Sequence, residues 1–528
     1  MDSKHVLAKR VGLFSSATLI SRILGYIRDA SVAYVFGGGM LTDSFYTAFR
    51  VSNLFRRLLG EGALSSSFVP VFTQSLKTEA PKKTQDFLNS LFTSLICILA
   101  IMTSLGILFT PQLMKLIAPG FSEDPQKFQI TVTLTRWMFP FFLFISLAAL
   151  VTGVLNSLKH FFLPAVAPAM LSVAEITYLL GIIPLLLFTL KSFSIETQMI
   201  GLAISAVVGG MGHFIVQIPS ILKENFSLKW SWNWKHPQSI QVVKLMIPAI
   251  VGLSVDQIDA FIDTICATYL IEGSVTALYN SNRLMQLPLA LFGIAIASVS
   301  LSTLSDHSAE KDFQKFSETI NSSLRLMIFT VLPSSIGLIV LSYPVCALLF
   351  QHGKFTAIQT QLTAGTLSAY SIGLIAYSTV KVLANSFYAL QMPKIPVRIA
   401  VSCMLFHIVL NLILMKPLGA SGLALATSLT SILNATWLFI LLRKEIKKHL
   451  HDSTKNIDFH LGTFLIKTFF SGTVMFIYLI LILKWGAQWN VPVQVTVSIL
   501  GGILLYFSMA KLLKIEEQQT LLKILLRK

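Results

Sequence analysis

Charged residues are scarce in this sequence. They make up 12% of its 528 residues, whereas soluble domains carry about 25%. Hydrophobic residues reach 54%, and the mean hydropathy is +0.72. So few polar side chains cannot cover a water-facing surface, which excludes a soluble globular protein. The composition instead predicts an all-α protein that crosses a membrane many times.

Cysteine is also scarce, and the four cysteines lie far apart inside apolar stretches without CxxC spacing. This pattern favours packing residues over disulfide bonds or metal ligands. The N-terminus begins with basic residues, but Ser21, Arg22, Arg28 and Asp29 interrupt the apolar run that a signal peptide needs. We therefore expect no cleaved signal.

Familiar catalytic motifs are missing as well. The chain has no GxxxxGK, GxSxG or HExxH motif and no glycine-rich dinucleotide loop after a strand, so we expect neither an enzyme nor a bound cofactor or metal. The net charge of +17 comes from 41 Lys and Arg against 24 Asp and Glu. Without a clustered, soluble basic face it does not indicate a nucleic-acid partner.

What the sequence does contain is a series of long apolar segments. A window of about 19 residues finds segments of spanning length between charged or Pro/Gly-rich breaks. We predict fourteen transmembrane helices, and we expect the amphipathic stretch 343–356, which is too short to cross, to lie in an interface. The spans are 13–36, 44–72, 87–109, 130–155, 163–189, 198–222, 240–268, 275–304, 318–341, 357–388, 395–415, 420–442, 461–483 and 493–513.

Basic residues are distributed unevenly between alternate loops. One set of loops, with the two termini, holds roughly two dozen Lys and Arg, whereas the other set holds six. The positive-inside rule therefore places both termini in the cytoplasm, which requires an even number of spans. The six lysines of the poor set are Lys115, Lys127, Lys191, Lys354, Lys416 and Lys484.

The two halves of the chain show a weak similarity. A shift of 233 residues places Tyr46 and Arg50 over Tyr279 and Arg283, and it also aligns a glycine and two serines that follow. Six spans separate the copies, so both would insert in the same orientation. We predict six-helix lobes at 1–225 and 236–445, and a last region, 456–528, with two further helices and a cytoplasmic tail. Chance similarity between apolar segments is the alternative.

The first two spans carry unusual charge. An arginine at the bilayer centre costs about 2.5–3.5 kcal/mol, so we expect these side chains to face protein or a cavity. Internal ion pairs would explain Arg50 and Arg57. Arg28 and Arg56 have no opposite charge one helical turn away, and Arg283 has only amides near it. Because guanidinium matches phosphate bidentately, unpaired arginines favour a phosphate-bearing ligand, with structural ion pairs as the alternative. The charged residues are Arg22, Arg28, Asp29, Asp43, Arg50, Arg56, Arg57 and Glu61.

Two further spans have polar faces. On the seventh, Asp256, Asp259 and Asp263 share one helical face, and they need a cation, a proton or an arginine partner. Ion coupling is one interpretation and a structural salt bridge is the other. On the tenth, a face that either lines the same cavity or lies at an interface holds Tyr370, Tyr377, Lys381, Asn385 and Tyr388.

Several motifs resemble those of the MurJ (MviN) lipid II flippases, along the whole chain and in the same order. The resemblance implies two six-helix lobes around a central cavity plus two C-terminal helices, as in the multidrug and oligosaccharidyl-lipid exporters. The motifs include Ser21-Arg22-Ile23-Leu24-Gly25, Arg28-Asp29, Thr42-Asp43-Ser44-Phe45, Asn53, Arg56-Arg57, Glu61-Gly62-Ala63, Asn282-Arg283-Leu284-Met285 and Phe350-Gln351-His352-Gly353-Lys354-Phe355.

The resemblance also implies a function and a place in the cell. Such a protein moves lipid II, the undecaprenyl-pyrophosphate-linked peptidoglycan precursor, across the bacterial inner membrane by alternating access. Membrane lipids surround it, and the cell-wall synthesis machinery is a further candidate partner. The family's cavity arginines correspond to Arg22, Arg28, Arg56 and Arg283. The polar and gating residues beside them would be Ser21, Asp29, Asp43, Asn53 and Glu61.

The sequence departs from the family pattern in places. Ser52 and Ser302 stand where the family usually has proline. His407 and Asn411 stand where some members have sodium ligands, so a sodium site is doubtful, and either the membrane potential or an ion gradient would supply the energy. The alternative function is a multidrug or other lipid-linked oligosaccharide exporter of the same fold. A membrane-embedded glycosyltransferase would need a catalytic acid in an outer loop, where candidates are few.

Overall fold

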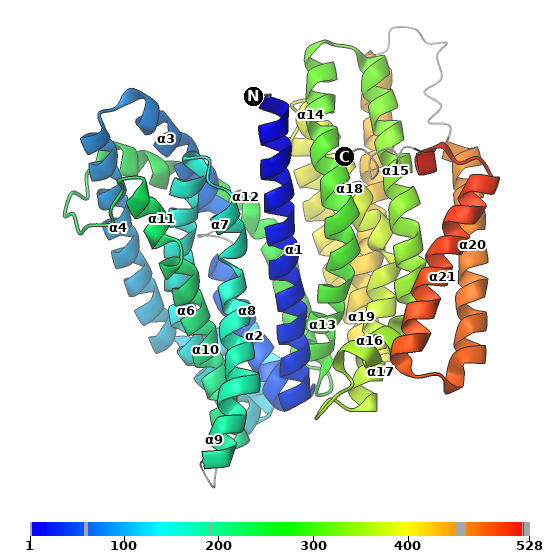
Figure 1. Cartoon of the computed structure of the whole chain (residues 1–528), viewed down its shortest axis with the longest axis horizontal. Coiled ribbons are helices and arrows are strands. Elements are labelled where there is room, and N and C mark those ends of the chain that lie inside the picture. The colour runs from blue at the N-terminus through cyan, green and yellow to red at the C-terminus, as the bar shows by residue number, and fades with distance from the viewer. Residues whose placement is uncertain (1–2, 57–61, 190–192, 450–460, 520, 522–528) are drawn as a thin grey trace. The chain divides into compact units, whose positions relative to one another are not determined.

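The computed structural model describes residues 3–56, 62–189, 193–449, 461–519 and 521. Every regular element in this part of the chain is helical, which confirms the all-α fold class (Figure 1). By packing, the chain divides into two compact units, residues 1–272 and 273–528. Each unit is described by itself.

The first unit is built around one long, mainly apolar helix, α6, which packs against α2, α3, α4 and α10. The helix α8 packs against α10 on one side and α1 on the other. Three stacked phenylalanines, Phe68, Phe72 and Phe87, join α3 to α4 in the core. The elements are α1 (Ser3–Phe36), α2 (Met40–Phe55), α3 (Ser65–Thr78), α4 (Pro81–Leu108), α5 (Thr110–Ile117), η2 (Pro119–Glu123), α6 (Pro125–Ser157), α7 (Phe162–Val166), α8 (Ala169–Thr177), η3 (Tyr178–Ile182), α9 (Ile183–Thr189), α10 (Ile195–Ile215), α11 (Ile218–Lys223) and α12 (Pro237–Thr268).

In the second unit, α17 and α18 pack against α19, and α15 packs against α18. The pair α20–α21 rests on α15, where the hydroxyl of buried Tyr506 donates to the Phe329 carbonyl at 2.9 Å. The elements are α13 (Ser274–Pro288), η4 (Leu289–Ile294), α14 (Ala295–Ala309), α15 (Phe313–Val340), α16 (Ser342–Phe350), α17 (Ala357–Ile372), α18 (Leu374–Ala389), α19 (Lys394–His449), α20 (Leu461–Trp485), η5 (Gly486–Gln488) and α21 (Val491–Leu512).

A helix or a broken helix lies over each of the fourteen predicted segments. The two segments predicted at 395–415 and 420–442 are joined in α19, which turns at Gly419, whose φ of 56° suits a residue without Cβ. Within the described residues, nine helices are long and apolar enough to cross a membrane, and the bent pair α17–α18 makes a tenth. The helices α1, α2 and α12 are not among them, and they carry several of the charged residues singled out above, including Arg22, Arg28, Arg50 and Asp259.

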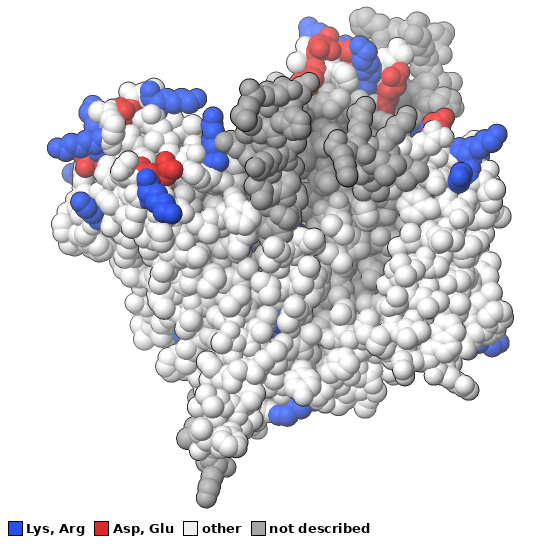
Figure 2. Space-filling view, in the orientation of Figure 1, with Lys and Arg blue, Asp and Glu red and all other residues white. Residues whose placement is uncertain are grey.

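Charge lies at the ends of the helices. On the face drawn in Figure 2, nearly all Lys, Arg, Asp and Glu atoms are at helix ends, and the flanks of the helices are uncharged. This distribution is typical of a protein whose flanks face lipid. Together with the helical content it makes this chain a multi-pass membrane protein.

The seventh predicted span was assigned to the second lobe, which was expected to begin at residue 236. In the structure α12 packs against α3, α4, α5 and η2, and the division between units falls after Glu272. The lobes were predicted from the internal repeat, whereas the two units are defined by packing. The lobe boundaries therefore stay a prediction.

Candidate functional site

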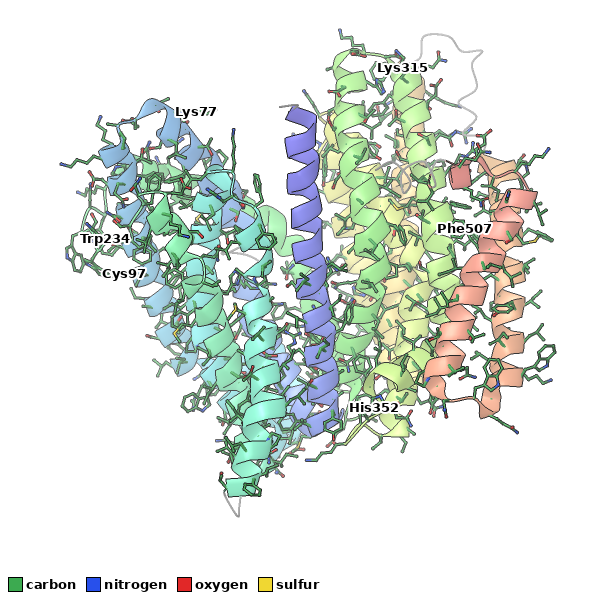
Figure 3. All side chains as sticks on the ribbon, viewed as in Figure 1. Lys77, Cys97, Trp234, Lys315, His352 and Phe507 are labelled. Atoms are coloured by element: carbon green, nitrogen blue, oxygen red, sulfur yellow. The ribbon has the colours of Figure 1, made fainter. Side chains whose placement is uncertain are left out.

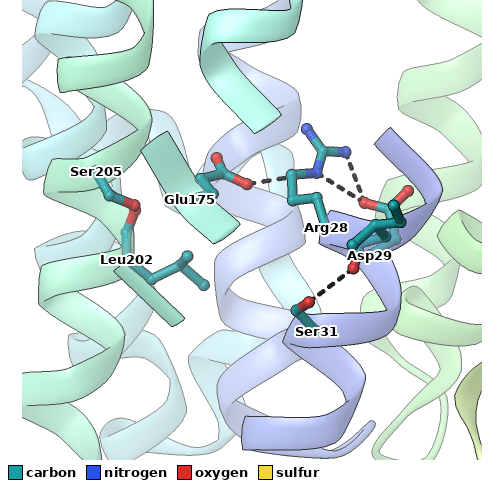
Figure 4. Close-up of polar contacts among 7 residues, drawn as sticks. Arg28, Asp29, Ser31, Glu175, Leu202 and Ser205 are labelled. Carbon is teal, nitrogen blue, oxygen red and sulfur yellow. Dashed lines mark hydrogen bonds and ion pairs between the residues drawn. The ribbon is translucent and has the colours of Figure 1, made fainter. Parts of the chain in front are cut away.

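Among the described arginine side chains of the first unit, Arg28 on α1 is the most deeply buried. Its Nη2 and Nε atoms donate to Asp29 Oδ1 at 2.6 and 2.9 Å, and Nε lies 3.4 Å from Glu175 Oε2 on α8 (Figure 4). All three side chains are at most 6% exposed. Phe49 on α2 lies 5.9 Å from the guanidinium carbon. The cation is therefore enclosed by two carboxylates and an aromatic ring.

This arrangement corrects the prediction that Arg28 has no charged partner. The prediction considered only residues one helical turn away on the same helix. One partner, Asp29, is the adjacent residue, and the other, Glu175, belongs to a helix about 150 residues further along the chain. A lone acidic residue inside the fifth apolar segment was the available sequence signal for Glu175.

Asp43, near the start of α2, pairs with Lys127 in the first turn of α6 at 3.3 Å. Both side chains are buried, and the Lys127 ammonium also lies 4.2 Å from the centre of the Phe121 ring. From the sequence, Lys127 was counted as an ordinary loop lysine. The structure shows instead that Asp43 and Lys127 form a buried ion pair joining α2 to α6.

Arg50 makes neutral hydrogen bonds where an ion pair was expected. Its Nη1 atom donates to the Ala260 carbonyl at 2.9 Å and to the Thr264 hydroxyl, both on α12. Since Arg50 is half-buried in the middle of α2, these bonds tie the second span to the seventh.

Two further cations of the first unit are half-buried. Arg56, just after α2, donates from Nε to Asn53 Oδ1 at 2.5 Å. Arg22 on α1 has neither a hydrogen bond nor an ion pair among the described residues, and Ser21 beside it is half-buried. Arg57 and Glu61 lie outside the described residues. Arg22 and Arg56 are therefore accessible enough to meet an added anion.

The acidic face of α12 is only partly described. Asp259 and Asp263 are half-buried, and the side chain of Asp256 lies outside the described residues. In the described part of the chain, no three His, Cys, Asp or Glu side chains are arranged to hold a metal. In the second unit, His407 and Asn411 are buried and hydrogen-bonded to each other at 3.3 Å, and the His407 ring lies 3.3 Å from the Thr427 hydroxyl.

The second unit contributes Arg283, half-buried on α13. Nearby on the same helix, Gln286 donates to Asn282 at 2.5 Å. Lys381 on α18 is half-buried without a hydrogen bond or ion pair in the described residues, whereas Asn385 donates to the Ala297 carbonyl of α14 at 2.9 Å. The polar face of the tenth span therefore has a packing role at Asn385, and Lys381 remains available.

The second unit also has a cavity of about 350 Å³ at the start of α20, lined by Arg325, Lys467, Lys514 and Glu516 among others. Arg325 is already neutralised, because its Nε lies 2.5 Å from Glu517 Oε1 and its Nη2 3.7 Å from Glu516 Oε2. Its guanidinium also lies 4.9 Å from the Phe464 ring. These contacts hold the C-terminal segment onto α15 and α20.

The cations of α1 and α2, buried in an otherwise apolar bundle, are therefore the main candidate site. A family model described as lipid II flippase MurJ matches residues 32–526. The chain belongs to the MurJ family of lipid II flippases.

Relatives and solved structures agree with this family. A probable lipid II flippase of Vibrio cholerae is 35% identical over 459 residues, 86% of each chain. The lipid II flippase of Burkholderia cenocepacia is 35% identical over 434 residues, 81% of this chain and 82% of that one. A solved structure of a MurJ flippase in an inward closed conformation matches with a TM-score of 0.77 at 28% identity, over 95% of this chain and 98% of that one.

An inward-facing multidrug transporter of the MATE family also matches, with a TM-score of 0.66 over 84% of this chain and 99% of that one. Its identity of 11% indicates a shared fold and no more. The predicted exporter-like architecture of the MurJ family is consistent with this likeness.

Proposed function

We propose that this protein is a lipid II flippase, which moves the peptidoglycan precursor from the cytoplasmic to the outer leaflet of the bacterial inner membrane. The observation that carries the proposal is the set of arginines held inside the first two spans of a chain that belongs to this family. A flippase translocates its substrate and makes no covalent change, which agrees with a chain that lacks the catalytic motifs sought above.

The substrate's pyrophosphate is the group that the arginines recognise. Arg22 and Arg56 are half-buried, so their guanidinium groups can still reach a ligand, and they bind phosphate oxygens directly. Their planar guanidinium groups donate two parallel hydrogen bonds, a geometry that lysine cannot reproduce. In the second unit, Arg283 is a further arginine that we propose binds phosphate.

Arg28 has a different role in this proposal, because Asp29 and Glu175 already neutralise it. The contact with Glu175 is the longer one, at 3.4 Å. A phosphate oxygen that displaced this carboxylate would exchange one ion pair for another, at little cost in desolvation. Arg28 therefore binds substrate in one state of the transport cycle and pairs with Glu175 in the other.

The finer architecture belongs to the same proposal. Fourteen spans, with both termini in the cytoplasm, form two six-helix lobes that open alternately to each side of the membrane. In support, the π-helical conformation at Arg56 recurs at Leu289, the first residue of the π-helical turn η4, which lies 233 residues further along the chain. Membrane lipids contact the uncharged flanks. Contact with the cell-wall synthesis machinery remains a prediction of the family resemblance.

The test is a lipid II accessibility assay in cells depleted of their own flippase. The wild-type chain should restore exposure of lipid II on the outer leaflet, and Arg56→Lys should reduce it at least tenfold at equal protein level. Arg136→Lys, the same change at an exposed arginine of α6, is the matched control and should retain full activity. Normal exposure with Arg56→Lys would contradict bidentate phosphate recognition, and no exposure with the wild-type chain would contradict the function.

A further inference from the structure

An extended segment, residues 226–236, joins α11 to α12 and carries three of the seven tryptophans. Trp230, Trp232 and Trp234 are 50%, 69% and 45% exposed. We call this stretch the tryptophan segment. Large aromatic rings that cluster on the surface are unfavourable in water and mark an interaction site. We therefore expect another surface to cover them.

The backbone of the tryptophan segment is fixed along α4. Three of its N–H groups, from alternate residues, donate to side chains that follow one another every four residues on α4. Two extended residues span about 6.8 Å and four helical residues rise about 6 Å, so the two spacings match. The pairs are Ser227 with Gln85, Lys229 with Asn89 and Ser231 with Thr93, at 3.0, 2.9 and 2.9 Å.

These bonds satisfy polar groups on both elements. Asn89, Ser90 and Thr93 are buried in the first turns of an apolar span, and Ser90 donates to the Asn233 carbonyl at 2.6 Å. Non-helical backbone at the level of a membrane is tolerated only where its polar groups are paired in this way. The tryptophan segment can therefore lie at the depth of the end of a transmembrane helix, and it need not stay in the water outside the membrane.

The side chains of the segment divide into two groups along one edge. Phe226 and Leu228 pack on the core between α3 and α4. The three tryptophans continue at alternate positions and contact one another, with ring centres 5.2 Å apart for Trp230–Trp232 and 5.9 Å for Trp232–Trp234. Figure 3 shows Trp234 at the outer edge of the first unit, beside α4.

The surrounding charge is mainly positive. Residues 77–86 and 223–235, which flank the tryptophan segment, contain six lysines and three carboxylates. Two of the lysines, Lys229 and Lys235, are exposed within the segment itself. Tryptophan is enriched at membrane–water interfaces, and lysine is attracted to anionic lipid headgroups. A strip of indole rings bordered by lysines therefore matches the headgroup layer of an anionic leaflet.

We propose that the tryptophan segment is an interfacial anchor, which places its three indole rings in the headgroup layer of an anionic membrane leaflet. The assignment of that leaflet to the cytoplasmic side rests on the orientation in the proposed function. The rings bury their apolar faces among the upper acyl chains, and their N–H groups reach lipid oxygens. Because the ladder of hydrogen bonds joins the segment to α4, the anchor fixes the depth of α4 and of the start of α12.

The experiment measures the fluorescence of the full-length protein with Trp137, Trp437, Trp485 and Trp489 replaced by Phe, so that only the three segment tryptophans emit. The protein is placed in nanodiscs of phosphatidylglycerol, with and without bromine on the upper acyl chain. We expect brominated lipid to quench more than half of the emission. Quenching of less than half would overturn the proposal, and strong quenching by iodide in its place would assign the surface to a soluble partner.

A matched control places one tryptophan in water. The variant Glu310→Trp, with the segment tryptophans also changed to Phe, carries its indole in the exposed turn before α15. We expect iodide to quench this variant and brominated lipid to leave its emission unchanged. Quenching by brominated lipid here would show that the assay does not report depth, and the depth would then be measured with spin labels at residues 230 and 310.

A separate comparison of anionic and zwitterionic lipid tests the role of the lysines. Quenching by brominated lipid should be greater in phosphatidylglycerol than in phosphatidylcholine discs, and Lys229→Gln with Lys235→Gln should remove that difference. Equal quenching in both lipids would overturn the anionic part of the proposal. None of these measurements involves flipping, so their outcome is independent of the proposed function.

Discussion

At the scale of single residues, two arginines of the first unit differ in what their removal leaves behind. Arg28 is the cation between two carboxylates, Asp29 and Glu175, which are almost fully buried. Arg56 is half-buried and hydrogen-bonded to the neutral amide of Asn53. Removal of Arg28 leaves two buried carboxylates without this cation, whereas removal of Arg56 leaves a neutral amide without its donor.

The substitution Arg28→Ala should therefore lower the free energy of unfolding by about 3–5 kcal/mol. Arg56→Ala should change it by less than about 1 kcal/mol and abolish flipping. Thermal unfolding of the purified variants, together with the lipid II accessibility assay, checks both statements. Equal stability of the two variants would show that the Arg28 ion pairs do not hold α1 and α8 together.

The sequence showed which apolar spans contain charged residues, but it did not show which residues pair with them. A charge inside an apolar span is visible in the sequence, and this located the cations of α1 and α2. The partners Glu175 and Lys127 come from helices whose faces are set by packing, which no spacing along the chain reveals. As a result, the sequence exaggerated how many arginines lack an internal counter-charge.

At the scale of elements, hydropathy located the long helices, because burial in lipid demands about 20 apolar residues in a row. It did not reveal the ladder between α4 and the tryptophan segment. In this ladder, backbone N–H groups donate to side chains. Its only trace in the sequence is the four-residue spacing of Gln85, Asn89 and Thr93. Polar residues in a span were read as candidate cavity residues, whereas these three satisfy an adjoining backbone.

Acid should loosen this element through His236, whose ring stacks on Phe87 at 5.6 Å. Burial lowers the pKa of His236 below its ordinary value of 6.5, against an opposing effect of Asp86 and Glu79. Because protonation is disfavoured in the folded state, the stabilisation is present above about pH 6.5 and is lost as the pH falls below it.

Emission of the three segment tryptophans should accordingly change on acidification below about pH 6.5, in the variant that retains only those indoles. His236→Gln removes the titrating ring and should abolish the change while leaving the emission at neutral pH unaltered. A transition that persists in His236→Gln would assign the pH response to another group.

A second element-scale prediction concerns the pair α20–α21. The C-terminal segment is fixed by Glu517, which is nearly buried against Arg325. Glu517→Ala leaves a largely buried guanidinium with only the exposed Glu516, and it should cost about 2 kcal/mol, between the values for surface and buried pairs.

Hydrogen exchange in α20 should therefore accelerate in Glu517→Ala. The control is Lys448→Ala, which removes an exposed partner of Glu445 and should cost less than about 1 kcal/mol. Unchanged exchange in α20 would show that the apolar contacts of Tyr506 and Phe329 suffice to hold the helix pair.

At the scale of the whole molecule, the all-α class and the family could be predicted from the sequence, whereas contacts between distant helices could not. The seventh span is an example. The internal repeat places it at the start of a predicted second lobe, and in the structure Arg50 on α2 bonds to Ala260 and Thr264 on α12, so this helix packs with the first unit. Contacts between helices far apart in the chain decide such groupings.

This grouping bears on how transport is energised. Moving an anionic lipid outward is favoured by an inside-negative potential, by about 2.3 kcal/mol per charge per 100 mV. The alternative is an ion that binds the acidic face of α12 with different affinity in the two states. Asp259 and Asp263 are half-buried on this face. The two energy sources therefore predict different behaviour for the neutral variants of these residues.

Asp259→Asn and Asp263→Asn should retain most lipid II exposure at the outer leaflet, and collapsing the potential with an ionophore should stop exposure in both variants and in the wild type. Glu196→Gln, at the exposed start of α10, is the matched control for loss of one carboxylate. If the α12 variants flip at a rate that no longer depends on a sodium or proton gradient that drives the wild type, the acidic face is an ion site. In that case, binding of the ion to α12 would favour one arrangement of the helices over the other. The bonds from Arg50 would transmit this effect from α12 to α2.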